Sequence, residues 1–190
     1  MASTSDQLND LRPLRHDDVE RVLAFLVAMP EGDRTFFKET DDRATVERWV
    51  EDERAGRWII CDEDGQVEAY LAVIPGVGWS SHVGELRLVV ASGHRRRGLG
   101  RALARRGLLE AVRRGLDKIV VEVVATREGD VEMFSSIGFE AEALLTNQIR
   151  DRTGNTQDLV ILAHDVAAVR DSMEVLGIDE ATDPTAGGAS

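Results

Sequence analysis

The chain has 190 residues and a formal net charge of −12, and apolar residues make up 43% of it. This size and composition are typical of one globular domain with a sizeable core. The sequence has no run of about 18 apolar residues, so we expect no membrane span. The acidic balance argues against a nucleic-acid partner. The single cysteine, Cys61, excludes an internal disulfide, and its apolar surroundings favour packing over reactivity.

The two ends of the chain differ in composition from its middle. Residues 1–10 are polar, with neither a basic start nor an apolar segment, so we expect a disordered N-terminus, no secretory signal and a cytoplasmic location. Residues 182–190 are rich in Gly, Ala and Pro and predict a disordered tail. We therefore expect a single domain over 11–166, followed over 167–190 by a short C-terminal helix and the tail.

The first half of the chain predicts an edge strand, two helices and a β-hairpin. A proline inside 11–15 favours an edge strand there, because proline cannot donate a ladder hydrogen bond. Helical spacing of apolar residues predicts a helix over 16–29, and Asp41 with Asp42 caps a second one. The turn sequence Glu63-Asp64-Gly65 follows an apolar run and precedes a run in which apolar and polar residues alternate. This order predicts a β-hairpin.

The second half predicts a parallel βαβ unit followed by a hairpin. Apolar runs over 83–90 and 118–124 predict strands, and helical spacing over 99–115 predicts the helix between them. The dense β-branched composition of 118–124 favours a central strand that is buried on both faces. A short helix over 130–136 precedes a final hairpin over 140–164, whose turn contains Thr-Gly-Asn.

A basic, glycine-containing turn lies between the first strand of this unit and its helix. It reads His94-Arg95-Arg96-Arg97-Gly98-Leu99-Gly100-Arg101. The first N–H groups of a helix have no intrahelical partners, and the helix dipole adds positive charge there, so such a turn can hold an anion. Glycines allow the backbone to approach the ligand closely. The alternative is an ordinary strand-to-helix turn that carries surface arginines. The acidic residues in the rest of the chain could steer a cationic co-substrate to the protein, but we interpret them as an aid to solubility.

Two motifs in this order resemble the GNAT superfamily of acyl-CoA-dependent N-acetyltransferases. Arg95 to Gly100 matches the family signature Arg/Gln-x-x-Gly-x-Gly/Ala position by position, and Phe134 to Phe139 matches the family's short helix followed by Gly-Phe. The resemblance covers about 11–166. It implies an α/β (α+β) fold, with a mixed, mostly antiparallel sheet of about six or seven strands, the parallel βαβ unit at the coenzyme A site and helices on both faces.

The resemblance also implies that acetyl-CoA is the co-substrate and that no metal takes part. The pyrophosphate would lie on the turn and the first helical residues, formed here by Arg95, Arg96, Arg97, Gly98, Leu99, Gly100 and Arg101. The pantetheine arm would add to the strand edge at Val89 and Val90 as an extra strand does. A backbone N–H near Val90 would polarise the thioester carbonyl. The arm needs a gap between the strands over 83–90 and 118–124.

The residue expected to take the proton from the attacking amine is Glu85. It precedes Arg95 by ten residues, an offset that resembles the catalytic glutamate of some family members. An exposed strand carboxylate is the alternative reading, and His82 is a second candidate that is otherwise a surface histidine. Glu122, in an apolar run, either faces the ligand cleft or pairs with an arginine.

One position departs from the family pattern. Phe134 stands where many members carry a tyrosine whose hydroxyl protonates the leaving thiolate, so it can line the cofactor site but cannot supply that proton. Water, Ser135 or Tyr70 would have to act instead; because a free thiol has a pKa near 8.5, a general acid is useful but not essential.

Two functions therefore remain open. The first is an N-acetyltransferase for a primary amine of a small molecule or an amino terminus. The second is a non-catalytic GNAT-like module that binds acyl-CoA and regulates. A P-loop nucleotide binder is discounted, because the Gly-Lys-Ser/Thr ending is missing.

We expect the acceptor pocket in 30–40, 76–82 and the last hairpin. Homodimer formation is left open.

Overall fold

The computed structural model describes residues 8–30, 33, 42–151 and 154–168. The predictions for residues 1–7, for Asp41 and most of the 30–40 segment, and for the C-terminal helix and tail from 169 onward lie outside these residues. Leu8, inside the N-terminal segment that we expected to be disordered, packs against the core. Among the described residues, no helix is long and apolar enough to cross a membrane.

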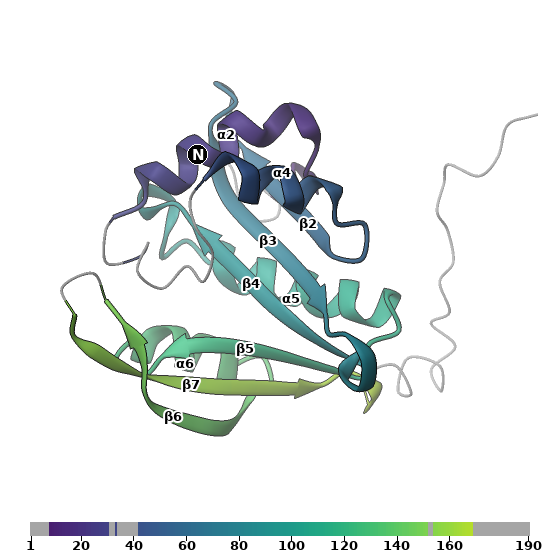
Figure 1. Ribbon diagram of the computed structural model, residues 1–190, viewed down its shortest axis with the longest axis vertical. Coiled ribbons are helices and arrows are strands. Elements are labelled where there is room, and N and C mark those ends of the chain that lie inside the picture. The colour runs from purple at the N-terminus through teal and green to yellow at the C-terminus, as the bar shows by residue number, and fades with distance from the viewer. Residues whose placement is uncertain (1–7, 31–32, 34–41, 152–153, 169–190) are drawn as a thin grey trace, which may run out of the picture.

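A single mixed sheet of seven strands runs through the molecule in the order β1-β2-β3-β4-β5-β7-β6 (Figure 1). Every neighbouring pair is antiparallel except β4 and β5, which are parallel. This confirms the predicted mixed, mostly antiparallel sheet. The strands are β1 (Arg12–Pro13), β2 (Gly56–Cys61), β3 (Val67–Pro75), β4 (Val83–Val90), β5 (Lys118–Val124), β6 (Glu140–Arg150) and β7 (Thr156–Asp165).

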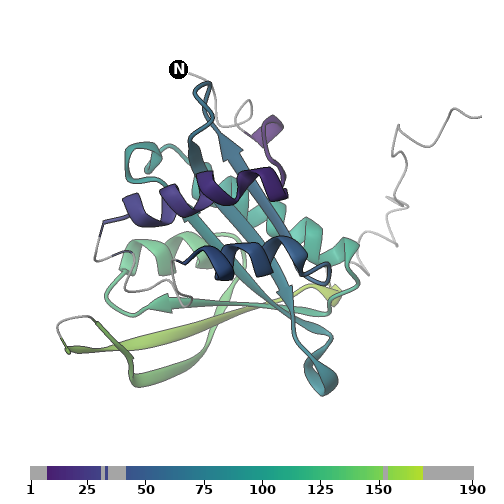
Figure 2. The same cartoon turned by 45° about the horizontal axis from the view of Figure 1, so that its top comes forward.

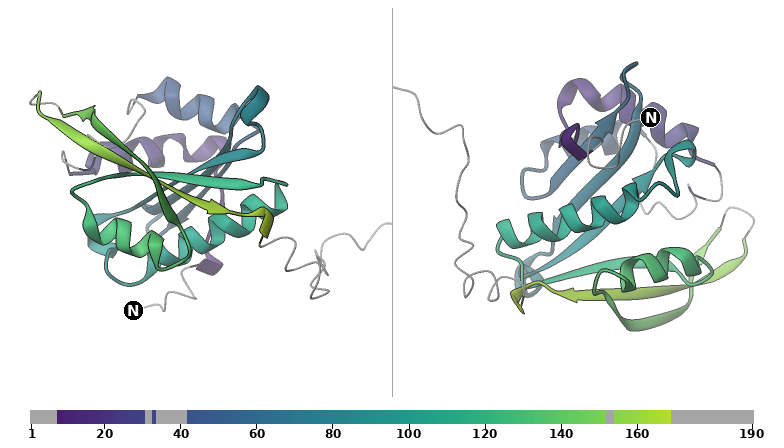
Figure 3. Two further views of the ribbon diagram at one scale, coloured as in Figure 1. Left: turned by 90° about the horizontal axis from the view of Figure 1, so that it is seen from below. Right: turned by 180° about the vertical axis from the view of Figure 1, so that it is seen from behind.

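Helices cover both faces of this sheet, as expected (Figures 2 and 3). α2 (Val19–Ala28) and α4 (Arg43–Glu51) lie on one face, and α5 (Leu99–Arg113) and α6 (Glu128–Ser135) lie on the other. The described part of the chain also contains the 3-10 turns η1 (His16–Asp18), η2 (Gly78–Ser80) and η3 (Ser92–His94). The helix that we expected over 16–29 thus begins as a 3-10 turn, and α6 begins two residues earlier than expected.

The N-terminal helices are fixed by two aspartates. Asp42 accepts a hydrogen bond from the backbone N–H of Thr45 at 2.9 Å and so caps α4. Asp18 is buried and accepts two hydrogen bonds from Arg12, at 2.6 and 2.7 Å, and one from Arg21 at 3.1 Å. The hydrogen bond with Arg12 is the main reason why the pKa of Asp18 falls to about 2. Asp18 therefore joins β1 to η1 and α2.

A separate hydrophobic core lies on each side of the sheet. The α2–α4 side is built on β2 and β3 through residues such as Ile59 and Tyr70. The α5–α6 side also includes β4 and β5. Its packing is tight at Gly107 of α5, where an added Cβ would lie 2.4 Å from Leu86 Cδ1 of β4. A side chain larger than glycine would therefore displace β4 or its leucine.

The prediction that β5 is buried on both faces is wrong. Ile119 and Val121, which face α5, are buried, whereas Val120 and Glu122 on the other face are half-buried. The reason lies in the position of α2 and α4, whose core contacts in the sheet come from β2, β3 and the end of β4. The face of β5 that carries Val120 and Glu122 is therefore only partly covered.

Candidate active site

Strands β4 and β5 pair only at their beginnings. Their parallel register runs from Val83↔Lys118 to Glu85↔Val120 and then stops, although β4 continues to Val90 and β5 to Val124. β5 stays paired with β7 over its whole length, and the two parallel strands diverge (Figure 1). This divergence is the gap that the family resemblance implies.

The backbone of β4 presents hydrogen-bonding groups to this gap. Gly76 N–H donates to the carbonyl of Val83, and Ala91 N–H donates to the carbonyl of Glu68, both at 2.8 Å, so odd-numbered residues of β4 bond to β3. The even-numbered residues then direct their N–H and C=O groups to the side where β5 has moved away. Val90, which we expected to supply an oxyanion donor, is one of them.

The turn after β4 has the backbone geometry of an anion-binding loop. Gly98 is the N-cap of α5 with φ of +85°, and Arg96 also has a positive φ, of +59°. α5 has 15 residues, so its N-terminus carries a substantial partial positive charge. Nothing lies within 4 Å of the position that a Cβ on Gly100 would take. The loop is thus open at the point where a phosphate would approach.

The side chains of this loop divide into three groups. Arg96, Arg97 and Arg101 are exposed. Leu99 is buried in the core, so only its backbone can face a ligand. Arg95 turns back: its Nε donates to the carbonyl of Val90 at 2.9 Å. Arg95 therefore stabilises the junction between the strand and the loop.

Asp33 bridges the ends of the two diverging strands. It accepts a hydrogen bond from Arg95 at 2.7 Å, on the loop after β4, and another from Arg127, which precedes α6 after β5. Its side chain is 12% exposed. Burial raises the pKa of Asp33, but the hydrogen bonds from the two arginines outweigh it, and the pKa lies below its ordinary value. Sequence reasoning did not find this bridge.

Glu85 lies where the parallel pairing ends. Arg87 holds its carboxylate on both oxygens: Nε donates at 2.9 Å and the terminal NH2 nitrogen donates at 3.0 Å. The two side chains are 20% and 21% exposed, so they remain accessible. Because alternate residues of a strand share a face, Glu85 and Arg87 lie on the side of β4 opposite Leu86 and Val90, which face the α5 core.

The other expected site residues lie farther away. His82 is exposed and precedes β4, at the end where the two strands pair, and its carbonyl accepts from Asp117 N–H at 2.8 Å. Trp79, expected near the acceptor pocket, is 95% exposed in the same β3–β4 connection. Neither side chain comes together with the anion-binding loop.

Phe134 belongs to the hydrophobic core. It is 4% exposed and packs edge-to-face against Phe139, with ring centroids 5.2 Å apart. The aromatic position of the family motif is therefore occupied by a packing residue here.

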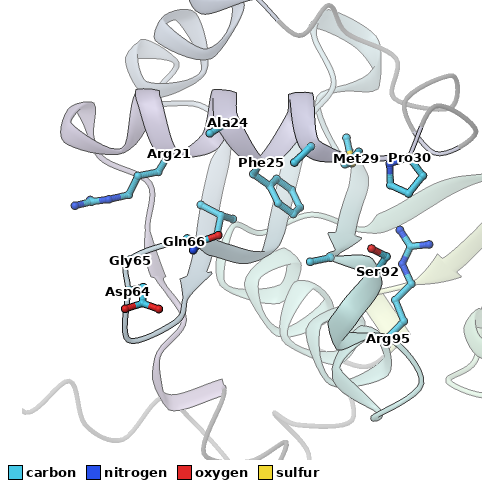
Figure 4. Close-up of a pocket in the computed structure, with 13 residues that line it drawn as sticks. Arg21, Ala24, Phe25, Met29, Pro30, Asp64, Gly65, Gln66, Ser92 and Arg95 are labelled. Carbon is cyan, nitrogen blue, oxygen red and sulfur yellow. The ribbon is translucent and has the colours of Figure 1, made fainter.

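A cavity of about 510 Å³ lies beside the loop, between α2 and the turn that joins β2 to β3 (Figure 4). Its walls are mostly apolar, with the Phe25 ring pointing inward and Met29 and Pro30 beside Arg95. Among the described residues of the expected pocket segments, only Pro30 contributes to it. Within the described part of the chain, no group of three or more His, Cys, Asp or Glu side chains could hold a metal ion.

Comparison with known proteins decides the family. Residues 23–139 match the family described as Acetyltransferase (GNAT). The chain belongs to this family. No curated protein sequence matches it. As a GNAT protein, it has both motifs in their usual structural settings: the first is the turn between β4 and α5, and the second ends α6.

Solved structures support the same fold. A chimera of the Vibrio cholerae spermidine N-acetyltransferase and hSSAT is 18% identical with a TM-score of 0.69, covering 83% of this chain and 95% of its own. A ribosomal-protein-alanine N-acetyltransferase from Brucella melitensis is 22% identical, also with a TM-score of 0.69, covering 82% and 98%. At these identities the similarity establishes the GNAT fold and leaves the substrate open.

Proposed function

We propose that this GNAT protein transfers the acetyl group of acetyl-CoA to a primary amine of a small molecule or an amino terminus. The observation that carries the proposal is that β4–β5 pairing ends at Glu85↔Val120, so that the rest of β4 borders a gap that leads to the anion-binding loop at its end. A gap between strands accepts an extended amide chain, and the loop accepts its diphosphate. One ligand with both parts is an acyl-CoA.

Each part of the site then has a task. Backbone N–H groups of the loop from Arg96 to Arg101 hold the pyrophosphate, and open space at Gly100 lets it approach. The even-numbered residues of β4 bond the pantetheine arm. The N–H of Val90 donates to the thioester oxygen, where negative charge develops during attack. Arg95 keeps the carbonyl of the same residue occupied, which fixes the orientation of that peptide.

The proton balance assigns Glu85 its role. An alkylammonium is mostly protonated at neutral pH and must lose a proton before it can attack. Glu85 accepts that proton, the nitrogen forms the new C–N bond, and the C–S bond breaks with its electron pair on sulfur. The second proton that the nitrogen loses as it becomes an amide passes to solvent water. Since Phe134 has no hydroxyl, water protonates the thiolate. The low basicity of a thiolate makes this route adequate.

A second candidate is a GNAT module that binds acyl-CoA without turnover. Two observations favour it: the buried Phe134 where a general acid is common, and the engagement of both Glu85 oxygens by Arg87. This candidate predicts cofactor binding with no release of thiol.

The test compares two glycines at opposite ends of α5. Gly98 and Gly115 both have left-handed backbones, with φ of +85° and +67°, so either change to alanine should cost about 1–2 kcal/mol of stability. We expect Gly98→Ala to raise the Kd for acetyl-CoA at least tenfold by calorimetry, and Gly115→Ala to leave it unchanged.

Turnover is measured as thiol release with a broad panel of amines. Release with at least one amine supports the enzyme. Binding without release from any amine supports the non-catalytic module. If acetyl-CoA does not bind, or if the two glycine variants weaken binding equally, the proposed site is wrong.

A further inference from the structure

Two arginines at the ends of the diverging strands converge on one carboxylate. Arg95 lies in the loop after β4, and Arg127 lies between β5 and α6. A terminal nitrogen of Arg95 donates to Oδ2 of Asp33 at 2.7 Å, and a terminal nitrogen of Arg127 donates to Oδ1 of the same side chain. Cationic groups from the ends of two separated strands therefore meet at a single anion.

Both arginines are anchored to their own strands without help from Asp33. Nε of Arg95 donates to the carbonyl of Val90, the last residue of β4, at 2.9 Å. The backbone N–H of Arg127 donates to the carbonyl of Val124, the last residue of β5, also at 2.9 Å. A guanidinium matches the geometry of carboxylate and phosphate oxygens. The pair therefore forms a site for an oxyanion.

Asp33, which occupies this site, belongs to neither strand. It lies between α2 and α4, and its backbone N–H donates to the carbonyl of Pro30 at 2.8 Å. Its side chain is 12% exposed, so burial raises its pKa, but the hydrogen bonds from Arg95 and Arg127 lower the pKa by more. The carboxylate thus depends on the two arginines, whereas the arginines are held by the strands. Another anion can take its place.

The site lies where the proposed cofactor would pass. The diphosphate would lie on the loop from Arg96 to Arg101, and the pantetheine arm would lie in the gap that ends at Val90 and Val124. The bridge through Asp33 spans this end of the gap. A diphosphate carries more negative charge than a carboxylate and offers more oxygens, so it is the stronger ligand for two guanidinium groups.

We propose that Arg95 and Arg127 form a second part of the diphosphate site, and that Asp33 occupies this part until acyl-CoA binds. The inference rests on the proposed function and adds Arg127 and Asp33 to its cofactor site. On binding, the terminal nitrogens of both arginines exchange an oxygen of Asp33 for an oxygen of the diphosphate, while Nε of Arg95 stays on the carbonyl of Val90.

Asp33 is then an internal competitor of the cofactor. The affinity for acyl-CoA is lower than the two arginines alone would give, because part of the binding free energy is spent on releasing the carboxylate. In return, a singly charged anion gains no advantage over Asp33 and is rejected. The bridge therefore makes the site selective for an anion with the charge of a diphosphate.

The experiment measures the Kd of coenzyme A for the full chain by calorimetry. We expect Arg127→Gln to raise the Kd about fivefold, because one guanidinium no longer binds the diphosphate, and Asp33→Asn to lower it about threefold, because the competitor loses its charge. In the double variant, the gain from Asp33→Asn should shrink. The matched control is Asp130→Asn, which also removes a carboxylate near Arg127, at 3.6 Å, but from a 53% exposed side chain. It should leave the Kd nearly unchanged.

Dephospho-coenzyme A identifies which phosphate the arginines bind. It keeps the diphosphate and lacks the phosphate on the ribose, so Arg127→Gln should weaken its binding by the same factor. A loss confined to coenzyme A itself would assign the arginines to the ribose phosphate and overturn the proposal.

The remaining results separate this inference from the proposed function. If Gly98→Ala weakens binding but Arg127→Gln does not, the loop site stands and its second part is wrong. A higher Kd in Asp33→Asn, an equal gain in Asp130→Asn or an undiminished gain in the double variant would overturn the role of Asp33. If coenzyme A does not bind the wild type, both proposals fail. A gain in affinity cannot come from loss of folded protein, so the result for Asp33→Asn is decisive even where Arg127→Gln unfolds.

Discussion

Asp18→Asn tests how the N-terminal helices are attached to the sheet. The buried Asp18 carboxylate accepts hydrogen bonds from Arg12 and Arg21, and these lower its pKa from 3.8 to about 2. This gap corresponds to about 2 kcal/mol of folding free energy. Because the pKa is lower in the folded state, the contribution is complete above pH 4 and is lost as the pH falls through 2.

The assay is urea unfolding of wild type and Asp18→Asn between pH 7 and pH 2. We expect the wild type to be more stable by about 2 kcal/mol at pH 7, with the difference closing as wild-type Asp18 becomes protonated. Asp17→Asn, a change at the exposed neighbouring residue, is the control and should cost a few tenths of a kcal/mol. A difference between wild type and Asp18→Asn that does not vary with pH would refute the reasoning.

Further predictions concern the site and the core. Gly107→Ala should destabilise by about 1 kcal/mol, because its Cβ would meet Leu86 Cδ1 at 2.4 Å and overpacking outweighs the gain in helix propensity; a higher urea midpoint would contradict this. Gly100→Ala has open space, so it should keep the wild-type midpoint but raise the Kd for acetyl-CoA, measured by calorimetry. Asp33→Asn should lower the Kd for acetyl-CoA a few-fold, because a carboxylate no longer competes for Arg95 and Arg127. The lost ion pairs should cost about 1 kcal/mol of stability. A higher Kd in this variant would show that Asp33 assists binding.

The order of the elements could be predicted because each has a local cause. The strand over 83–90 and the strand over 118–124 have the bounds that their apolar runs predict, and α5 begins at Leu99, after the left-handed Gly98. Local sequence determines both the alternation of a strand and the turn that precedes a helix. These features also contain the family motif, so the position of the loop between β4 and α5 followed from sequence.

The divergence of β4 and β5 could not be predicted from the residues alone. Leu86 to Val90 and Val121 to Val124 are as strand-like as the residues before them, and the partner of a strand depends on tertiary packing. For the same reason sequence did not reveal that Asp33 joins Arg95 to Arg127. These pairs link segments whose separation in the chain, 62 residues for Asp33 and Arg95, carries no periodic signal.

Neither edge of the sheet gives another chain a good template for β-pairing. β1, at one edge, has two residues, and one of them is Pro13, which lacks an N–H. β6, at the other edge, has register shifts at Ala141/Ala143 and at Leu145/Ile149, with a left-handed Asn147 in the second. Bulges of this kind bend an edge strand and interrupt its ladder. The protein is therefore protected at both edges against edge-to-edge aggregation, and deletions that straighten β6 should be the first to remove that protection.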